Sequence, residues 1–142
     1  MKKTLLAAAL LLLSACSDTT QPPLAGVLVT MTGNSFGRNS TTGIATVPYV
    51  VFNSTGAIIA VPICSQRVAA VVERRNGATW EVVDSPTCEE APGSVPAQLQ
   101  PGSRLSSEAL LDVPGHYRLR IPFTASGQTV QLESVSPEFD VG

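Results

Sequence analysis

The sequence is poor in basic residues. Lysine and arginine together number 9 against 11 aspartates and glutamates, and the only lysines are Lys2 and Lys3. Nucleic acids and anionic membrane surfaces are bound mainly through clustered basic side chains. Because no basic run follows residue 3, the composition argues against nucleic acid and against an anionic lipid surface as partners.

Residues that carry catalysis are also scarce. His116 is the only histidine, and a serine or cysteine nucleophile generally needs a base close to it. His116 stands beside a turn, on the polar side of an alternating segment, so we expect it to be a solvated surface residue. The sequence therefore predicts a protein that is not an enzyme, with no catalytic residue, no metal site and no cofactor.

No apolar run stands out as long enough to cross a membrane. The run from Leu5 to Leu13 has nine residues, whereas a transmembrane helix needs about 20. It follows the two lysines and precedes Ser14 and Ala15. A basic start, an apolar middle and small residues at a cleavage point are typical of a secretory signal peptide. We interpret residues 1–15 as such a peptide, whose removal leaves seven arginines against eleven acidic residues.

The end of this segment, Leu13-Ser14-Ala15-Cys16, resembles the lipobox of bacterial lipoproteins. The resemblance implies that the thiol of Cys16 receives a diacylglycerol group and that the new amino terminus is acylated. Each buried methylene contributes about 0.8 kcal/mol to membrane binding, so several chains anchor a protein stably. An ordinary secretory signal, cleaved after Ala15 and leaving Cys16 unmodified, is the alternative.

The residues after Cys16 bear on location. In lipoproteins of Gram-negative cells, an aspartate directly after the lipidated cysteine favours retention in the inner membrane. Here Ser17 holds that position and Asp18 follows it. The resemblance thus implies the cell envelope, with the outer membrane favoured over the inner one if the host is Gram-negative. Residues 16–25 are expected to form a lipidated tether that reaches only about 30 Å when extended.

Two further cysteines, Cys64 and Cys88, lie in the exported part of the chain. Paired cysteines in an exported domain favour a disulfide, worth about 3 kcal/mol in the loop-entropy account. A zinc site would need two more ligands, and redox-active pairs commonly have the Cys-x-x-Cys spacing. We therefore predict a Cys64–Cys88 disulfide.

Residues 26–142 carry the pattern of one all-β domain. Short apolar runs alternate with turn signals, and no segment has a convincing helical period. The run from Tyr117 to Phe123 alternates apolar and polar residues. Residues 105–111 fit a strand or a short helix, and their alternation favours the strand. Together these features predict an immunoglobulin-like antiparallel β-sandwich of about 7–9 strands.

Turn signals divide this domain. Asn76-Gly77 between two β-like runs predicts a hairpin with a type I′ turn. Residues 33–43 and 85–102 are expected to be loops because Gly, Asn, Ser and Pro concentrate there, with a short strand near Val95 to Leu99. Trp80 and the cysteine pair are expected to mark the core.

From about Thr46 onward, the order of these signals resembles bacterial immunoglobulin-like domains. It is similar to those of small lipoproteins and of the intracellular proteinase-inhibitor-like family. The matching segments are Asn53-Ser54-Thr55, Asn76-Gly77 with Trp80, Pro101-Gly102-Ser103, Pro114-Gly115-His116-Tyr117-Arg118-Leu119, and Val135 to Val141. The resemblance implies a corner at Gly115 and Tyr117 like the tyrosine corner of immunoglobulin folds.

Four arginines are candidates for an interface: Arg74 and Arg75 at the hairpin, and Arg118 and Arg120 on one strand face. Guanidinium groups bind carboxylates and phosphates through paired hydrogen bonds. Alternatively, these arginines solubilise the face or pair with nearby acids.

These features favour a non-catalytic binding or accessory module, held in the cell envelope by its lipid. Its partner would be a protein or a polysaccharide, contacted through loops or an exposed strand edge. The alternative is an envelope proteinase inhibitor that presents a loop between or after Cys64 and Cys88.

Overall fold

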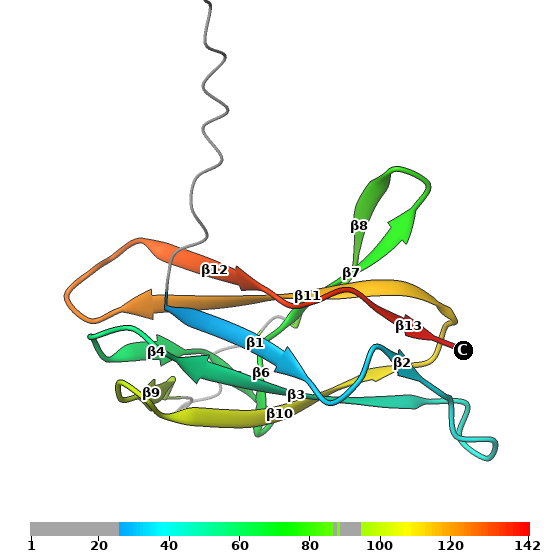
Figure 1. Ribbon diagram of the computed structural model, residues 1–142, viewed down its shortest axis with the longest axis horizontal. Coiled ribbons are helices and arrows are strands. Elements are labelled where there is room, and N and C mark those ends of the chain that lie inside the picture. Colours follow the sequence, from blue (N-terminus) through cyan, green and yellow to red (C-terminus); the bar gives the residue numbers. More distant parts are fainter. Residues whose placement is uncertain (1–25, 87, 89–94) are drawn as a thin grey trace, which may run out of the picture.

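The computed structural model describes residues 26–86, 88 and 95–142 (Figure 1). The signal peptide (1–15), the lipid acceptor Cys16 and the tether (16–25) lie outside these residues. Within them, every regular element is a β-strand, and nearly all strand pairs are antiparallel. The predicted all-β sandwich is therefore confirmed.

The described residues contain thirteen strand segments, more than the seven to nine predicted. Several have only two or three residues, and Pro62, which has no N–H to donate, separates β4 from β5. The segments are β1 (Val27–Met31), β2 (Ser35–Phe36), β3 (Ala45–Asn53), β4 (Ile59–Val61), β5 (Ile63–Cys64), β6 (Arg67–Val68), β7 (Val71–Asn76), β8 (Thr79–Asp84), β9 (Ala97–Leu99), β10 (Arg104–Leu111), β11 (Gly115–Ala125), β12 (Gln131–Val135) and β13 (Phe139–Val141).

Two sheets form the layers of the sandwich (Figure 1). The first has the order β1-β3-β10. The second is built on the long strand β11, which pairs with β13 and β7 along its first half and with β12 and β4 along its second half. Pro137, which has no N–H to donate to a ladder, lies between β12 and β13.

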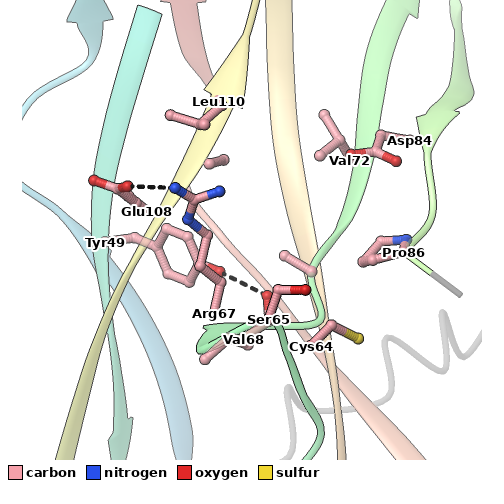
Figure 2. A pocket seen from close by; sticks show the side chains of 12 residues that line it. Tyr49, Cys64, Ser65, Arg67, Val68, Val72, Asp84, Pro86, Glu108 and Leu110 are labelled. Atoms are coloured by element: carbon pink, nitrogen blue, oxygen red, sulfur yellow. Dashed lines mark hydrogen bonds and ion pairs between the residues drawn. The ribbon is translucent and has the colours of Figure 1, made fainter. Parts of the chain in front are cut away.

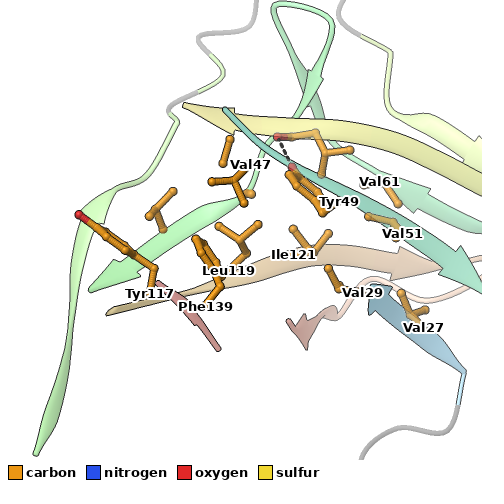
Figure 3. Packing of buried hydrophobic residues seen from close by; sticks show 14 of the residues in the cluster. Val27, Val29, Val47, Tyr49, Val51, Val61, Tyr117, Leu119, Ile121 and Phe139 are labelled. Atoms are coloured by element: carbon orange, nitrogen blue, oxygen red, sulfur yellow. Dashed lines mark hydrogen bonds between the residues drawn. The ribbon is translucent and has the colours of Figure 1, made fainter. Parts of the chain in front are cut away.

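The core lies between these sheets (Figure 3). Alternate residues of β3 face inward, and Val47, Tyr49 and Val51 are almost completely buried. They meet Leu119 and Ile121 of β11, which are also fully buried. This alternation is the expected result of a period of two on a sheet with one wet face.

The ambiguous segment 105–111 is a strand. β10 pairs with β3 over its whole length, from Arg104 opposite Phe52 to Leu111 opposite Ala45. The pairing begins at a bulge in which Gly102 has a positive φ of 78°. Gly102 N–H donates to Asn53 O, and Asn53 N–H donates to Ser103 O. This two-against-one pattern with a left-handed glycine is a G1 bulge.

The side chain of Asn53 ties the end of β3 to the turn that follows it and to β9. Its side chain is fully buried, and its Nδ2 donates to Ala57 O at 2.8 Å and to Leu99 O at 2.9 Å. Its Oδ1 accepts hydrogen bonds from the N–H and the hydroxyl of Thr55. A buried amide with both ends satisfied fixes the local chain path, because any displacement leaves polar groups unpaired.

The hairpin predicted at Asn76-Gly77 is confirmed, but the predicted type I′ turn is wrong. Asn76 belongs to β7 and pairs with Thr79 of β8, so the two turn residues are Gly77 and Ala78. Only Gly77 has a positive φ, of 60°. A positive φ at the first turn position alone is the mark of a type II′ turn, for which glycine is preferred there.

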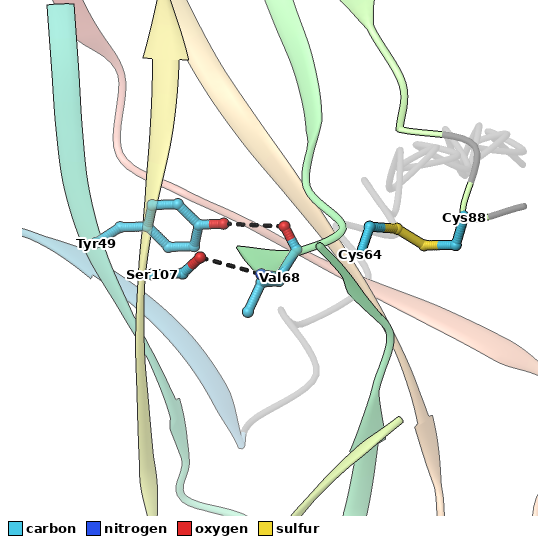
Figure 4. The surroundings of a disulfide bond; sticks show 5 residues. All are labelled: Tyr49, Cys64, Val68, Cys88 and Ser107. Carbon is cyan, nitrogen blue, oxygen red and sulfur yellow. Dashed lines mark hydrogen bonds between the residues drawn. A yellow bond between two sulfur atoms is a disulfide. The ribbon is translucent and has the colours of Figure 1, made fainter. Parts of the chain in front are cut away.

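Three other expectations need correction. Trp80 is not a core marker, because it is half-buried on β8 and is absent from the central cluster. The expected loop 33–43 contains β2, which pairs in parallel with β13 and places Phe36 against Phe139. The Cys64–Cys88 disulfide is confirmed, with a Cα–Cα distance of 5.3 Å, but its cysteines are half-buried beside the core (Figure 4).

The tyrosine corner implied by the resemblance is present. Tyr117, near the start of β11, is buried, and its hydroxyl donates to Val113 O at 2.7 Å. A hydroxyl that bonds to the backbone a few residues upstream is the defining contact of that corner. It ties the turn after β10 to the first residues of β11.

The turn between β5 and β6 is strained, and relieving that strain should stabilise the protein. Ser65 and Gln66 have positive φ values of 48° and 68°, a conformation that costs a non-glycine residue about 1 kcal/mol or more. We expect Gln66→Gly to raise the free energy of unfolding by about 1 kcal/mol, measured by chemical denaturation. Gln98→Gly, in the extended backbone of β9, is the control and should lower it. A loss of stability in both variants would contradict the interpretation of strain.

Candidate binding surface

The four candidate arginines do not form one patch. Adjacent residues of a strand point to opposite faces. Arg75 of β7 therefore lies on the outer face of the second sheet, which also carries Arg118 and Arg120 of β11. Arg74 lies opposite Tyr117 in the register and points the other way. The stem of Arg74 lies against Gly115, where an added Cβ would be 3.0 Å from Arg74 Cδ.

Arg118 and Arg120 are paired with acids of the same face. Glu73, whose side chain is 8% exposed, accepts a hydrogen bond from Arg118 Nε at 2.6 Å. Arg120 Nε lies 2.9 Å from the other oxygen of Glu73 as an ion pair, and Arg120 Nη1 donates to Glu133 at 2.7 Å. The Glu133 hydrogen bond raises the pKa of Arg120 above its ordinary value. Glu73 is thus a buried acid held by two cations.

Trp80 covers this network from the edge strand. Its ring lies 4.4 Å below the guanidinium of Arg118, and Arg75 approaches to 6.0 Å. The ring of His116 lies 5.9 Å from that of Trp80. A cation over an indole face is attracted by the ring quadrupole. Trp80, predicted to lie in the core, therefore packs against charged side chains on the surface.

His116 lies on the outer face, as predicted, and both of its ring nitrogens are engaged. Nδ1 lies 2.7 Å from Asp140, and Nε2 lies 2.7 Å from Glu138. Ionised carboxylates only accept hydrogen bonds, so both contacts are satisfied at once only by the protonated imidazolium. The hydrogen bond with Glu138, followed by that with Asp140, raises the pKa of His116, and His116 in turn lowers the pKa of Glu138.

His116, Glu138 and Asp140 form a clamp that makes the stability of the protein depend on pH. The pKa of His116 is raised in the folded state, so its contribution is present below the ordinary value of 6.5 and is lost as the pH rises through the folded pKa. The contribution of Glu138 is present above 4.5 and is lost as the pH falls through its lowered pKa. The clamp should be strongest between these values.

Urea denaturation at pH 6 and pH 9 measures this effect. We expect the midpoint of the wild-type protein to fall more between these two pH values than that of a His116→Asn variant. Equal shifts in the two proteins would show that the clamp does not contribute.

One motif escaped the sequence-based reasoning. Residues 33–37, Gly-Asn-Ser-Phe-Gly, have the Gly-x-Ser-x-Gly spacing of hydrolase nucleophiles. That motif acts on a sharp strand-to-helix turn, whereas Ser35 lies in β2. Asp140 of β13 pairs with Ser35 of β2 on one side and with His116 of β11 on the other, so it lies between them. A catalytic triad needs the histidine between serine and acid, so this row does not have that geometry.

A hollow opens where β10 faces the β5–β6 hairpin (Figure 2). Its volume is about 230 Å³, and its floor is apolar, with Val68, Val72 and Ala109 all buried. Arg67 and Glu108 form an ion pair of 3.0 Å at its rim. No sequence signal marks this site, because its walls come from six separate strands.

The hairpin is held over the hollow by two hydrogen bonds (Figure 4). Val68 N–H donates to Ser107 Oγ at 3.0 Å, and the hydroxyl of Tyr49 donates to Val68 O at 3.4 Å. Burial raises the pKa of Tyr49, so this hydroxyl stays protonated. The disulfide at Cys64 fixes the other side of the same hairpin.

The part of the chain that the structure describes has neither a metal-binding cluster nor a membrane-spanning helix. In residues 26–86, 88 and 95–142, no cluster of three or more His, Cys, Asp or Glu side chains is arranged to hold a metal ion. Over the same residues, no helix is long and apolar enough to span a bilayer.

No protein-family model matches this chain, and neither does any curated protein.

Proposed function

We propose that this protein is a bacterial lipoprotein, anchored in the cell envelope through Cys16, whose β-sandwich is a non-catalytic binding module. The observation that carries the proposal is the sequence Leu13-Ser14-Ala15-Cys16, followed after only ten residues by the first described residue of the domain. A short tether holds a binding domain close to its membrane, where a partner in the same envelope is in reach.

The side chains of the domain support binding rather than catalysis. The only histidine has both nitrogens occupied by carboxylates, which leaves it no position as a general base for a nucleophile. The surface instead offers a hollow with an apolar floor and a charged rim. Apolar floors rimmed by polar groups are typical of the pockets that receive anchor residues at protein interfaces.

Cross-linking in native envelopes tests this function. The lipidated protein would be purified after cross-linking, beside a control in which residues 1–25 carry an unrelated domain. We expect a protein or polysaccharide that is enriched with this domain and not with the control. Equal recovery of every component with both baits would contradict the proposed function.

A proteinase inhibitor is the second candidate. The observation in its favour is the exposed turn at Ser65 and Gln66, pinned by the adjacent disulfide. Assays of the mature protein against purified envelope proteases at micromolar concentration decide this point. Inhibition of any of these proteases would assign the protein to the proteinase inhibitors. No inhibition of any protease in the panel would exclude this second candidate.

A further inference from the structure

The strand β10 has an unpaired edge in the described part of the chain. It ends its sheet and pairs with β3 alone. The Asn53–Ser103 hydrogen bond fixes which residues face β3, because hydrogen-bonded pairs alternate along an antiparallel ladder. Odd-numbered residues therefore bond to β3, and the backbone groups of Ser106, Glu108 and Leu110 point to the free edge.

The β5–β6 hairpin closes only one part of this edge. Its Val68 N–H is bonded to the side chain of Ser107 rather than to the backbone of β10. Beyond Glu108 no strand is paired to the edge among the described residues. Leu110, 41% exposed, stands there at the mouth of the 230 Å³ hollow.

The size of the hollow indicates what it receives. Small-molecule sites usually measure about 300–1,000 Å³. The hollow itself, at about 230 Å³, is smaller and suits one apolar side chain, and an adjoining hollow of about 380 Å³ leaves room for a neighbouring residue of the same ligand. An extended peptide added to the edge would turn alternate side chains toward the hollow. Strand addition of this kind takes affinity from the backbone and specificity from such pockets.

The charged side chains beside the hollow also indicate what charge the partner carries. A second hollow continues from the first, shares Asp84 and Leu110 with it, and adds Arg74 and Asp112. Among the described residues, neither Asp84 nor Asp112 is ion-paired, whereas Glu108 at the other end is. Of the residues that line this second hollow, two carboxylates face one guanidinium, a net charge of one negative. Arg38, which is not among them, donates to the backbone oxygen of Asp112 rather than to its carboxylate.

We propose that the open end of β10 binds an extended segment of a partner protein by strand addition, with an apolar side chain in the hollow and a basic one beside Asp84 and Asp112. This inference rests on the proposed function as a binding module and names the chemistry of its partner. Another open edge with exposed apolar residues, β8, fits less well. Its ladder is broken by a bulge at Val72 and Glu73, a device that discourages edge pairing.

Peptide selection tests the inference. The full lipidated protein, held in nanodiscs, would be panned against a phage-displayed library of random dodecapeptides after depletion on empty nanodiscs. We expect enrichment of peptides that alternate apolar and polar residues and carry a lysine or arginine. Recovery of no peptide, or of acidic peptides, would overturn the proposal. If no peptide is selected while envelope cross-linking still recovers a partner, the proposed strand addition at β10 is wrong and the proposed function as a binding module stands.

Two variants locate the binding. Leu110→Pro removes an edge N–H but no bond to β3, a position where proline is tolerated, and it should abolish binding of the selected peptide. The double variant Asp84→Asn, Asp112→Asn should weaken binding about fivefold to tenfold. Glu133→Gln, on the other face of the second sheet, removes the same kind of charge and should leave affinity unchanged.

The double variant keeps the proposal testable if Leu110→Pro fails to fold. Affinity that is unchanged in Asp84→Asn, Asp112→Asn would overturn the proposed basic contact. Sedimentation of the free protein gives the remaining outcome. A homodimer that Leu110→Pro dissociates would assign the edge to a second copy of this chain and overturn the proposed partner.

Discussion

A Cys16→Ser variant is expected to lose the lipid and to leave the detergent phase entirely. The thioether to diacylglycerol forms on sulfur, and serine provides none. Each acyl methylene contributes about 0.8 kcal/mol to membrane binding, so removing all the chains removes essentially all of the hydrophobic anchoring. The measurements are incorporation of labelled palmitate and partition into Triton X-114.

The chain provides a matched control for this experiment. Cys64→Ser, Cys88→Ser removes the other two cysteines, which the structure joins as a disulfide, and it should still incorporate palmitate. Palmitate on the Cys16→Ser protein, or processing of the wild-type precursor that globomycin does not block, would refute the lipobox. The proposed envelope location would then lose its support.

An Asn53→Ala variant is expected to lose about 3–5 kcal/mol of folding free energy, a large part of the total for a domain of this size. Its amide makes four hydrogen bonds, to Ala57 O, to Leu99 O and to two groups of Thr55. Truncation leaves the carbonyl of the buried Leu99 without this partner, at about 1–3 kcal/mol, and removes three further hydrogen bonds at about 0.5–1.5 kcal/mol each. Chemical denaturation monitored by Trp80 fluorescence measures the loss.

Asn39 is the control for that experiment. Its Oδ1 accepts hydrogen bonds from the N–H groups of Thr41 and Thr42, in a local turn similar to that of Asn53. Asn39 is exposed, so water replaces its partners, and Asn39→Ala should cost about 1 kcal/mol or less. Similar losses in the two variants would mean that burial does not set the cost, contrary to the role assigned to Asn53.

Alternation along each strand made much of the fold predictable. The inward residues of β3 and β11 follow a period of two, and Ser107, Ala109 and Leu111 resolved the segment that also fitted a helix. Turn type was less predictable, because Asn76-Gly77 can occupy different positions of a two-residue loop. The register placed Asn76 in the strand and moved the turn by one residue.

The candidate surface was less predictable. Neighbouring arginines appear equivalent in sequence, but Arg74 and Arg75 point to opposite faces once the strand forms. The partner of Arg118 is Glu73, 45 residues away, and Trp80, predicted to mark the core, lies against Arg118 on this surface. The hollow beside β10 has no local signature at all, because only the packing of separate strands creates it.

The long strand β11 also makes the second sheet depend on contacts between segments that are distant in the sequence. The strands β4, β7, β12 and β13 all pair with residues 115–125, and two of them, β4 and β7, lie well before that segment in the sequence. Contacts between distant segments slow folding, since loops must close before any pairing is gained. A nascent chain that has not yet reached β11 cannot complete the second sheet, and its unpaired strand edges would be substrates for chaperones and proteases until residues 115–125 are synthesised.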